Sequence, residues 1–107
     1  MATPEGKVKA MIDRELKKRT LYYFNPQAGP FGKAGVPDKI LCVAGHFIGI
    51  EVKSAKGRTS PLQDACMQKI EDQGGKCFVV RDRDTLDETL EYIDACIARP
   101  KGFGTNS

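Results

Sequence analysis

Apolar residues recur along the chain with two kinds of spacing, and these spacings predict its secondary structure. Repeats of three and four residues indicate helices, whereas alternating or short continuous apolar runs indicate strands. Helices are predicted at residues 4–18, from residue 60 to the Gly74-Gly75 pair, and from residue 85 to the break at Pro100. Strands are predicted at residues 21–25, 38–44, 46–53 and 76–80, the last an apolar run expected at the centre of the sheet.

Each predicted helix begins with a capping signal. A polar side chain in front of a helix accepts a hydrogen bond from a free backbone N–H group, and proline suits the first helical position. The three signals are Thr3 with Pro4, Ser60 with Gln63, and Thr85 with Glu88. The last two pairs have the spacing of a capping box.

The order of the elements predicts an α/β fold. Helix, strand, hairpin, helix, strand and helix follow one another (αβββαβα), which indicates a small mixed β-sheet flanked by helices. Residues 1–107 are interpreted as a single domain, with residues 101–107 as a flexible tail. No apolar run approaches the ~20 residues of a membrane span and no signal peptide is present, so we expect a cytoplasmic protein without membrane contact.

Composition and charge refine this picture only slightly. The apolar neighbours of the four cysteines, without any CxxC pair, predict buried free thiols rather than disulfides or zinc ligands; these are Cys42, Cys66, Cys77 and Cys96. Residues 1–35 carry seven basic and three acidic residues, whereas residues 84–107 carry two and five. The basic N-terminal half also contains the hairpin, which favours a polyanion near it.

Three charged residues in the hairpin stand where a buried strand normally has apolar side chains. Side chains alternate between the two faces of a strand, so Glu51 and Lys53 point the same way. Asp38 begins the first strand and therefore lies opposite the end of the second. The sequence thus predicts that Asp38, Glu51 and Lys53 converge at one end of the sheet.

Two adjacent carboxylates repel each other, and a hard divalent cation relieves that repulsion. Mg²⁺ takes oxygen ligands, so the Val52 carbonyl is a further candidate beside Asp38 and Glu51. Such an ion can act on a phosphodiester as a Lewis acid, while Lys53 offsets the charge that develops on phosphorus. The alternative is an ion-paired strand end, with Asp38 in a turn after Pro37 and with Glu51 and Lys53 on a solvated face.

These residues resemble the signature of the PD-(D/E)XK nucleases, because "PD" at residues 37–38 is followed by "EVK" at residues 51–53. The wider pattern "GVPD…EVK…SPLQ" is similar to VRR-NUC (virus-type replication-repair nuclease) domains. That pattern also includes an acidic residue on the first helix and a glutamine on the helix after the EVK strand. Glu5 and Gln63 occupy those places, and the resemblance spans residues 5–81.

The resemblance implies a restriction-endonuclease-like core that cleaves DNA with Mg²⁺ or Mn²⁺. The implied metal ligands are Glu5, Asp38, Glu51 and the Val52 carbonyl. The implied catalytic residues are Asp38, Glu51, Lys53 and Gln63. Two of these assignments have a simpler alternative: an acidic residue in a first helical turn suits the helix dipole whatever its function, and Gln63 already completes a capping box.

Contacts to DNA phosphates are expected from lysines and arginines around the hairpin, namely Lys33, Lys39, Lys56 and Arg58. Lys39 departs from the family pattern, which commonly has an apolar residue after the aspartate. It is expected to add positive charge beside the metal site.

Three classes of function remain open on the sequence alone. The first is a divalent-metal-dependent endonuclease that is specific for DNA structure, such as a four-way junction or other branched DNA, and works as a homodimer with two active sites. The second is a non-catalytic nucleic-acid-binding module or accessory subunit on the same fold. The third is a protein-interaction domain that uses the acidic third helix, with Asp87, Glu88, Glu91 and Asp94.

Overall fold

The computed structural model describes residues 3–27 and 32–102, and within them it has the predicted order of elements. The helices are α1 (Pro4–Lys18), α2 (Pro61–Asp72) and α3 (Arg83–Ala98). The strands are β1 (Tyr22–Phe24), β2 (Lys39–Val43), β3 (His46–Val52) and β4 (Lys76–Val80). The prediction of a small mixed sheet flanked by helices is therefore confirmed.

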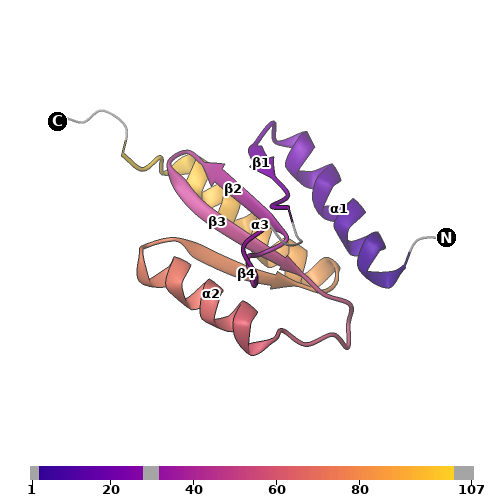
Figure 1. Cartoon of the computed structure of the whole chain (residues 1–107). Coiled ribbons are helices and arrows are strands. Elements are labelled where there is room, and N and C mark those ends of the chain that lie inside the picture. The colour runs from indigo at the N-terminus through magenta and orange to yellow at the C-terminus, as the bar shows by residue number, and fades with distance from the viewer. Residues whose placement is uncertain (1–2, 28–31, 103–107) are drawn as a thin grey trace.

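The four strands lie in the order β1-β2-β3-β4 (Figure 1). β1, β2 and β3 are antiparallel neighbours, and β4 runs parallel to β3. The prediction that β4 lies at the centre of the sheet is wrong, because the crossover through α2 returns the chain to the free side of β3. β4 is apolar along its length because helices cover both of its faces: it packs on α2 and on α3.

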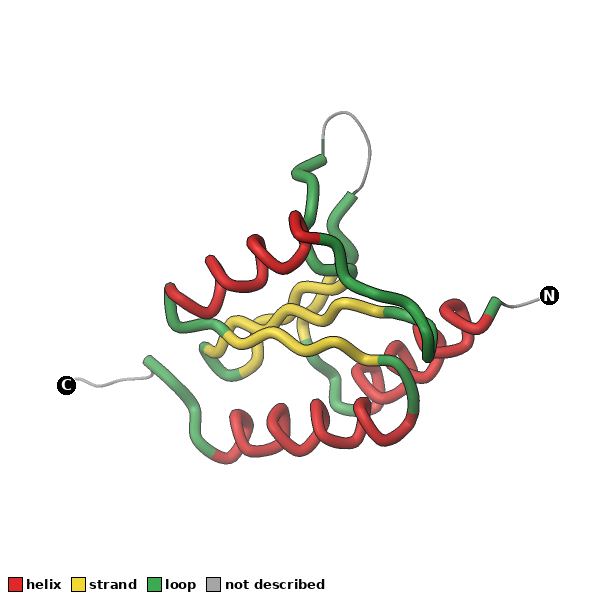
Figure 2. The backbone as a smooth tube through the Cα atoms, turned by 90° about the horizontal axis from the view of Figure 1, so that it is seen from below, coloured by secondary structure: helices red, strands yellow, loops and turns green. Residues whose placement is uncertain are grey.

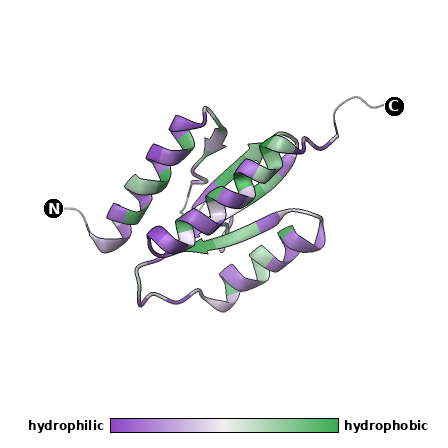
Figure 3. Cartoon of the chain, turned by 180° about the vertical axis from the view of Figure 1, so that it is seen from behind, coloured by the Kyte–Doolittle hydropathy of each residue, from purple (hydrophilic) through white to green (hydrophobic). Residues whose placement is uncertain are grey.

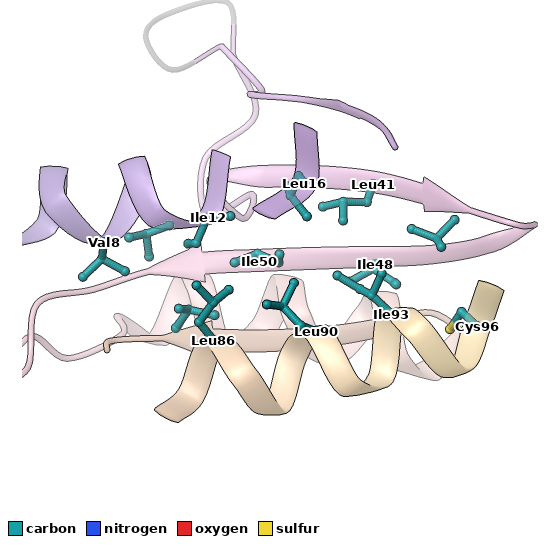
Figure 4. Close-up of a cluster of buried hydrophobic side chains, with 13 residues drawn as sticks. Val8, Ile12, Leu16, Leu41, Ile48, Ile50, Leu86, Leu90, Ile93 and Cys96 are labelled. Atoms are coloured by element: carbon teal, nitrogen blue, oxygen red, sulfur yellow. The ribbon is translucent and has the colours of Figure 1, made fainter. Parts of the chain in front are cut away.

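The helices form two layers around the sheet (Figure 2). α1 and α3 cover one face, and α2 covers the other. The hydrophobic core lies between the sheet and the α1–α3 layer, where Ile12 and Leu16 of α1 and Leu86 and Ile93 of α3 are fully buried (Figure 4). From the sheet, this core receives alternate residues of β2 and β3, such as Leu41, Ile48 and Ile50.

The α2 face of the sheet is less completely covered. None of the side chains of α2 is fully buried, although the strands beneath the helices are predominantly hydrophobic (Figure 3). Phe24 and Phe47, which point to this face, are 47% and 46% exposed. The two faces of the sheet therefore differ: the face under α1 and α3 forms the hydrophobic core, and the face under α2 is partly open to solvent.

The ends of α1 agree with the prediction, whereas α3 begins earlier than predicted. The Thr3 hydroxyl caps α1 by accepting the Gly6 N–H at 2.9 Å. For α3 the capping box is formed by Asp82 and Thr85 rather than by Thr85 and Glu88: the Asp82 carboxylate accepts the Thr85 N–H at 2.9 Å, and the Thr85 hydroxyl accepts the Asp82 N–H at 3.1 Å. Aspartate suits an N-cap as well as threonine does, so the earlier pair defines the helix start.

Two further predictions need correction at the C-terminal end and at the cysteines. Residues 103–107 of the predicted flexible tail lie outside the described residues, but Lys101 is attached to the hairpin turn, because its N–H donates to the Ala44 carbonyl at 2.8 Å. Cys96 is buried as predicted, and two cysteines are half-buried, but Cys42 is exposed. Cys42 points to the open face of the sheet, beyond the cover of α2.

None of the helices among the described residues is long and apolar enough to cross a membrane.

The loop before β2 packs tightly on the start of α2 at Gly35. Its φ is +82°, and a Cβ at this position would lie 2.7 Å from the Leu62 carbonyl oxygen. We therefore expect Gly35→Ala to lower the free energy of unfolding by about 2–3 kcal/mol, measured by urea denaturation. Gly102 is the matched control, since its φ is +73° and no atom of the described residues lies within 4 Å of its Cβ position, so Gly102→Ala should cost about 1 kcal/mol or less. Equal losses in the two variants would contradict close packing at Gly35.

Candidate active site

The carboxylates of Asp38 and Glu51 are brought together by the register of the hairpin. The tight turn at Ala44-Gly45 has positive φ at both residues, as a type I′ hairpin turn requires, and it pairs β2 with β3 up to Lys39 and Ile50. One step further along the same register, Asp38 lies opposite Glu51. The Asp38 carboxylate replaces a backbone acceptor there, because its Oδ2 accepts the Val52 N–H at 2.8 Å. The predicted meeting of the two acidic residues therefore occurs.

The position of Asp38 also depends on the residue before it. Pro37 is fully buried, and its ring lies over Gly49 of β3, so that a Cβ at Gly49 would stand only 3.0 Å from the Pro37 Cγ. Glycine therefore makes room for the proline ring at this point of the strand. This contact fixes the position of the backbone directly before β2, and with it the position of Asp38 beside Glu51.

The Glu51 side chain is only 3% exposed, an unusual environment for a carboxylate. Its Oε2 atom accepts a hydrogen bond from the Gln63 side-chain amide at 3.0 Å, and the Lys53 ammonium lies 3.5 Å from the same oxygen. Its Oε1 atom is buried and has no hydrogen-bond partner within the described part of the chain. A buried acceptor without a partner costs about 1–3 kcal/mol, so this oxygen is placed to receive a ligand.

Burial, and after it the neighbouring Asp38 carboxylate, raise the pKa of Glu51 from its ordinary value of 4.5 to about 7, and the positive charge of Lys53 limits this increase. Near neutral pH the site therefore holds a proton that a cation could replace.

Gln63 forms the predicted capping box and also contacts the buried carboxyl of Glu51. Its side-chain carbonyl accepts the Ser60 N–H at 2.9 Å and completes the capping box of α2. Its side-chain amide group donates at the same time to Glu51. The start of α2 therefore positions an amide donor at the buried carboxylate.

The donor set fits a hard divalent cation. Asp38 and Glu51 supply carboxylate oxygens, one of them buried without a partner among the described residues, and the Val52 carbonyl comes from the residue whose N–H fixes Asp38. Mg²⁺ and Mn²⁺ prefer such oxygen ligands and often use only one or two carboxylates.

Glu5 does not join these two carboxylates, which corrects the predicted ligand set. No group of three or more acidic, histidine or cysteine side chains that could hold a metal ion occurs among residues 3–27 and 32–102. The Glu5 carboxylate is 44% exposed and lies 3.6 Å from the Lys9 ammonium, one helical turn away. The physical reason is the layer to which it belongs, since α1 covers the face of the sheet opposite to the one toward which Glu51 points.

Lys39 is also placed differently from the prediction. Only 3% of its side chain is exposed, and its ammonium donates to Asp13 at 2.8 Å and to Asn25 at 3.0 Å. Side-chain alternation turns Lys39 away from its neighbour Asp38 and toward α1. It is therefore a buried structural lysine and is not available to a DNA phosphate.

The other predicted phosphate contacts are exposed around the site. Lys56 and Arg58 lie on the loop after β3 and line an open hollow of about 640 Å³. Lys33 lines a second hollow of about 300 Å³ that also contains Asp38 and Gln63. Lys33 therefore shares a hollow with Asp38, whereas Lys56 and Arg58 line a separate hollow that contains neither carboxylate.

Sequence reasoning missed Arg81, which holds the basic loop in place. Its guanidinium donates to the backbone carbonyls of Ser54 and Gly57 from the end of β4. The signal in the sequence was a single arginine directly after a buried apolar strand, which does not show what the side chain contacts.

Replacing Glu51 by glutamine tests the raised pKa. Because the folded-state pKa lies above the unfolded value, the folded protein holds this proton more tightly, and that stabilisation is fully present below about pH 4.5 and lost as the pH rises through about 7. In metal-free buffer, the wild type should lose up to about 3 kcal/mol relative to Glu51→Gln over this range. Urea denaturation at a series of pH values measures the difference, and parallel curves would contradict the raised pKa.

Replacing Arg81 by methionine tests its hold on the loop. The variant keeps the apolar stem but leaves two loop carbonyls without their donor, so the amides of residues 54–59 should exchange hydrogen faster while those of α3 stay protected. Hydrogen exchange with mass spectrometry provides the measurement. Unchanged exchange in the loop would show that other contacts hold it.

No family model and no curated protein matches the chain. A solved structure described as a VRR_NUC domain superposes with a TM-score of 0.73 and 22% sequence identity, covering 85% of this chain and 98% of that one. The chain therefore has the fold of a VRR_NUC domain, in agreement with the resemblance of its hairpin motif.

Proposed function

We propose that the protein is a DNA endonuclease that depends on Mg²⁺ or Mn²⁺. The observation that carries this proposal is the buried Glu51 carboxyl beside Asp38: its Oε1 has no hydrogen-bond partner among the described residues, and its Oε2 is paired with the Lys53 ammonium. A fold shared with a VRR_NUC domain supports the same conclusion. An acidic pair with an adjacent lysine is suited to phosphodiester hydrolysis, because the reaction needs both a cation and compensation of developing negative charge.

Each residue of the site has a role that follows from its contacts. Asp38, Glu51 and the Val52 carbonyl would hold the cation, which supplies Lewis-acid polarisation of a phosphate oxygen when it is bound. Lys53 contributes a positive charge that is partly withdrawn from solvent, where it is worth more than at the surface. Gln63 keeps the Glu51 carboxyl in one orientation by donating to its Oε2.

The DNA would be bound through its phosphates. Lys33, in the hollow that contains Asp38, and Lys56 and Arg58, on the loop after β3, provide positive charge at exposed positions. Contacts to phosphates give no information about the base sequence. We therefore infer that the protein selects its substrate by DNA structure, with branched or four-way-junction DNA as the substrate class. A homodimer would present two such sites for paired cuts, and sedimentation equilibrium measures whether the protein dimerises.

One observation favours a second candidate function, a non-catalytic DNA-binding module. The Glu5 carboxylate stands apart from the pair of Asp38 and Glu51, so the cation would have one carboxylate fewer than the motif implies. A module of this kind would bind DNA with a marked dependence on salt and would not cleave it.

Replacing Asp38 by asparagine separates the two functions. The wild type should cleave branched DNA when Mg²⁺ or Mn²⁺ is added, and Asp38→Asn should lower the rate by about 100-fold or more because it removes a charged ligand. Isothermal titration with Mn²⁺ alone should show uptake by the wild type and weaker uptake by the variant. Glu5→Gln is the matched control and should change the rate by less than about tenfold.

Two results would contradict the endonuclease. The first is equal cleavage by the wild type and Asp38→Asn, which would indicate a contaminating activity. The second is salt-dependent DNA binding without cleavage or Mn²⁺ uptake, which would favour the binding module.

A further inference from the structure

An apolar groove lies beside the candidate active site, between α2 and the open face of the sheet. Its volume is about 660 Å³, and its floor and walls include Phe24 of β1, Ile40 of β2, Phe47 of β3 and Ile70 of α2. Phe24, Ile40 and Phe47 belong to the sheet face that α2 covers only in part. None of them takes part in the site described above.

The groove is formed by small residues and by the strand register. Gly75 lies so close to Phe47 that a Cβ there would stand 3.2 Å from the phenyl ring, so the turn after α2 leaves space for an aromatic side chain. On the sheet, Phe24 pairs with Ile40, and Ile40 pairs with Gly49, over which the Pro37 ring lies. Phe24, Ile40 and Phe47 therefore present apolar side chains on the same face, and Phe24 and Phe47 are each about half open to solvent.

The charges around the groove are of one sign. Lys33 and Lys69 are among the described residues that line it, and no carboxylate is. The nearby Glu71 is directed elsewhere, since its carboxylate accepts the Cys77 N–H at 3.0 Å and lies 4.0 Å from the Lys76 ammonium. An occupant that combines flat apolar groups with negative charge would match this lining.

The groove adjoins the hollow of the candidate active site. Pro26, Lys33 and Val36 line both the groove and the smaller hollow that contains Asp38 and Gln63. A chain of nucleotides whose phosphate lies at Asp38 could therefore extend past Lys33 and reach Phe24 and Phe47 with its bases.

We propose that this groove binds unpaired bases of a single DNA strand next to the scissile phosphate, by stacking on Phe47 and Phe24. Lys33 and Lys69 contact the phosphates of the same strand. This inference rests on the proposed function and makes it more specific, because it assigns the substrate a single-stranded segment beside the cut. Stacking of a base on an aromatic side chain contributes about 1–3 kcal/mol and tolerates any base.

A second copy of the chain is a less suitable occupant. In a two-fold symmetric contact the same surface faces itself, so Lys33 and Lys69 of both copies would approach one another without a carboxylate among the described lining residues to offset them. Nucleic acid brings the opposite charge together with apolar rings, and it matches both properties of the lining at once.

Binding without a divalent cation tests the proposal independently of cleavage. Fluorescence anisotropy in EDTA is measured with a labelled single-stranded oligothymidine and with a blunt duplex of equal length. The double variant Phe24→Ala and Phe47→Ala should weaken binding of the single strand by about 5- to 100-fold and that of the duplex by less than about twofold. Ile97→Ala is the matched control, because Ile97 is 44% exposed on α3, the helix that covers the other face of the sheet, and it should change neither affinity.

Conservative variants separate stacking from general apolar contact. Phe47→Tyr should keep the affinity for the single strand, and Phe47→Leu should weaken it almost as much as alanine does because the aromatic face is absent. Replacing Lys33 and Lys69 by glutamine should make single-strand binding less sensitive to salt, since the slope of log K against log salt falls by about 0.7 for each phosphate that is no longer neutralised. Circular dichroism verifies that every variant is folded.

Three outcomes would overturn the proposal: equal weakening for single strand and duplex, wild-type affinity of Phe47→Leu, or conversion of a dimer into a monomer by Phe47→Ala without a change in single-strand affinity. Selective single-strand binding in a protein that cleaves no DNA would support the groove and would reject the endonuclease. Cleavage of DNA without selective binding of the single strand would support the endonuclease and would reject the groove.

Discussion

The burial of the Glu51 carboxyl beside Asp38 is the constraint on which the site depends. A carboxylate withdrawn from water is costly, and a second one across the strand pair adds repulsion, so the local structure must compensate for both. It does so with a lysine, with the amide of Gln63 and with a raised pKa, yet it leaves one oxygen without a partner among the described residues. An unsatisfied buried group lowers the stability of the fold, so it is expected at positions where it serves a function.

The rest of the fold holds these two side chains in place. The hairpin turn sets the register that opposes Asp38 and Glu51, and the Val52 N–H fixes Asp38 from the neighbouring strand. The core on the α1–α3 side supplies the burial that keeps the sheet rigid, with Ile50 and Val52 packed there on either side of Glu51 in sequence. Alternation along β3 therefore assigns stability to one face and chemistry to the other. The same division explains why the α2 face has room for both the site and an open groove.

The parts of the site that follow from short-range geometry were predictable from the sequence. Alternation and hairpin register are properties of neighbouring residues, and they predicted the meeting of Asp38 with Glu51 and the order of the elements. Alternation also places Lys39 on the side of the strand opposite to Asp38, so the expectation of a phosphate contact there gave too little weight to this geometry. Glu5 could not be placed, because the apolar stripe of α1 shows which side of the helix is buried but not which face of the sheet it covers. The edge position of β4, the contacts of Arg81 and the groove depend on how distant segments pack, and no local pattern encodes them.

The two contacts of Gln63 have a consequence for the amino acid that this position accepts. A capping box works equally well with glutamate, since only a side-chain oxygen is needed to accept the Ser60 N–H. Here the other half of the side chain must donate a hydrogen bond to Glu51, which an ionised glutamate cannot do and which would bring a third negative charge to the pair. The start of a helix thus becomes a filter that admits the amide and rejects the acid, although the two side chains are nearly identical in shape.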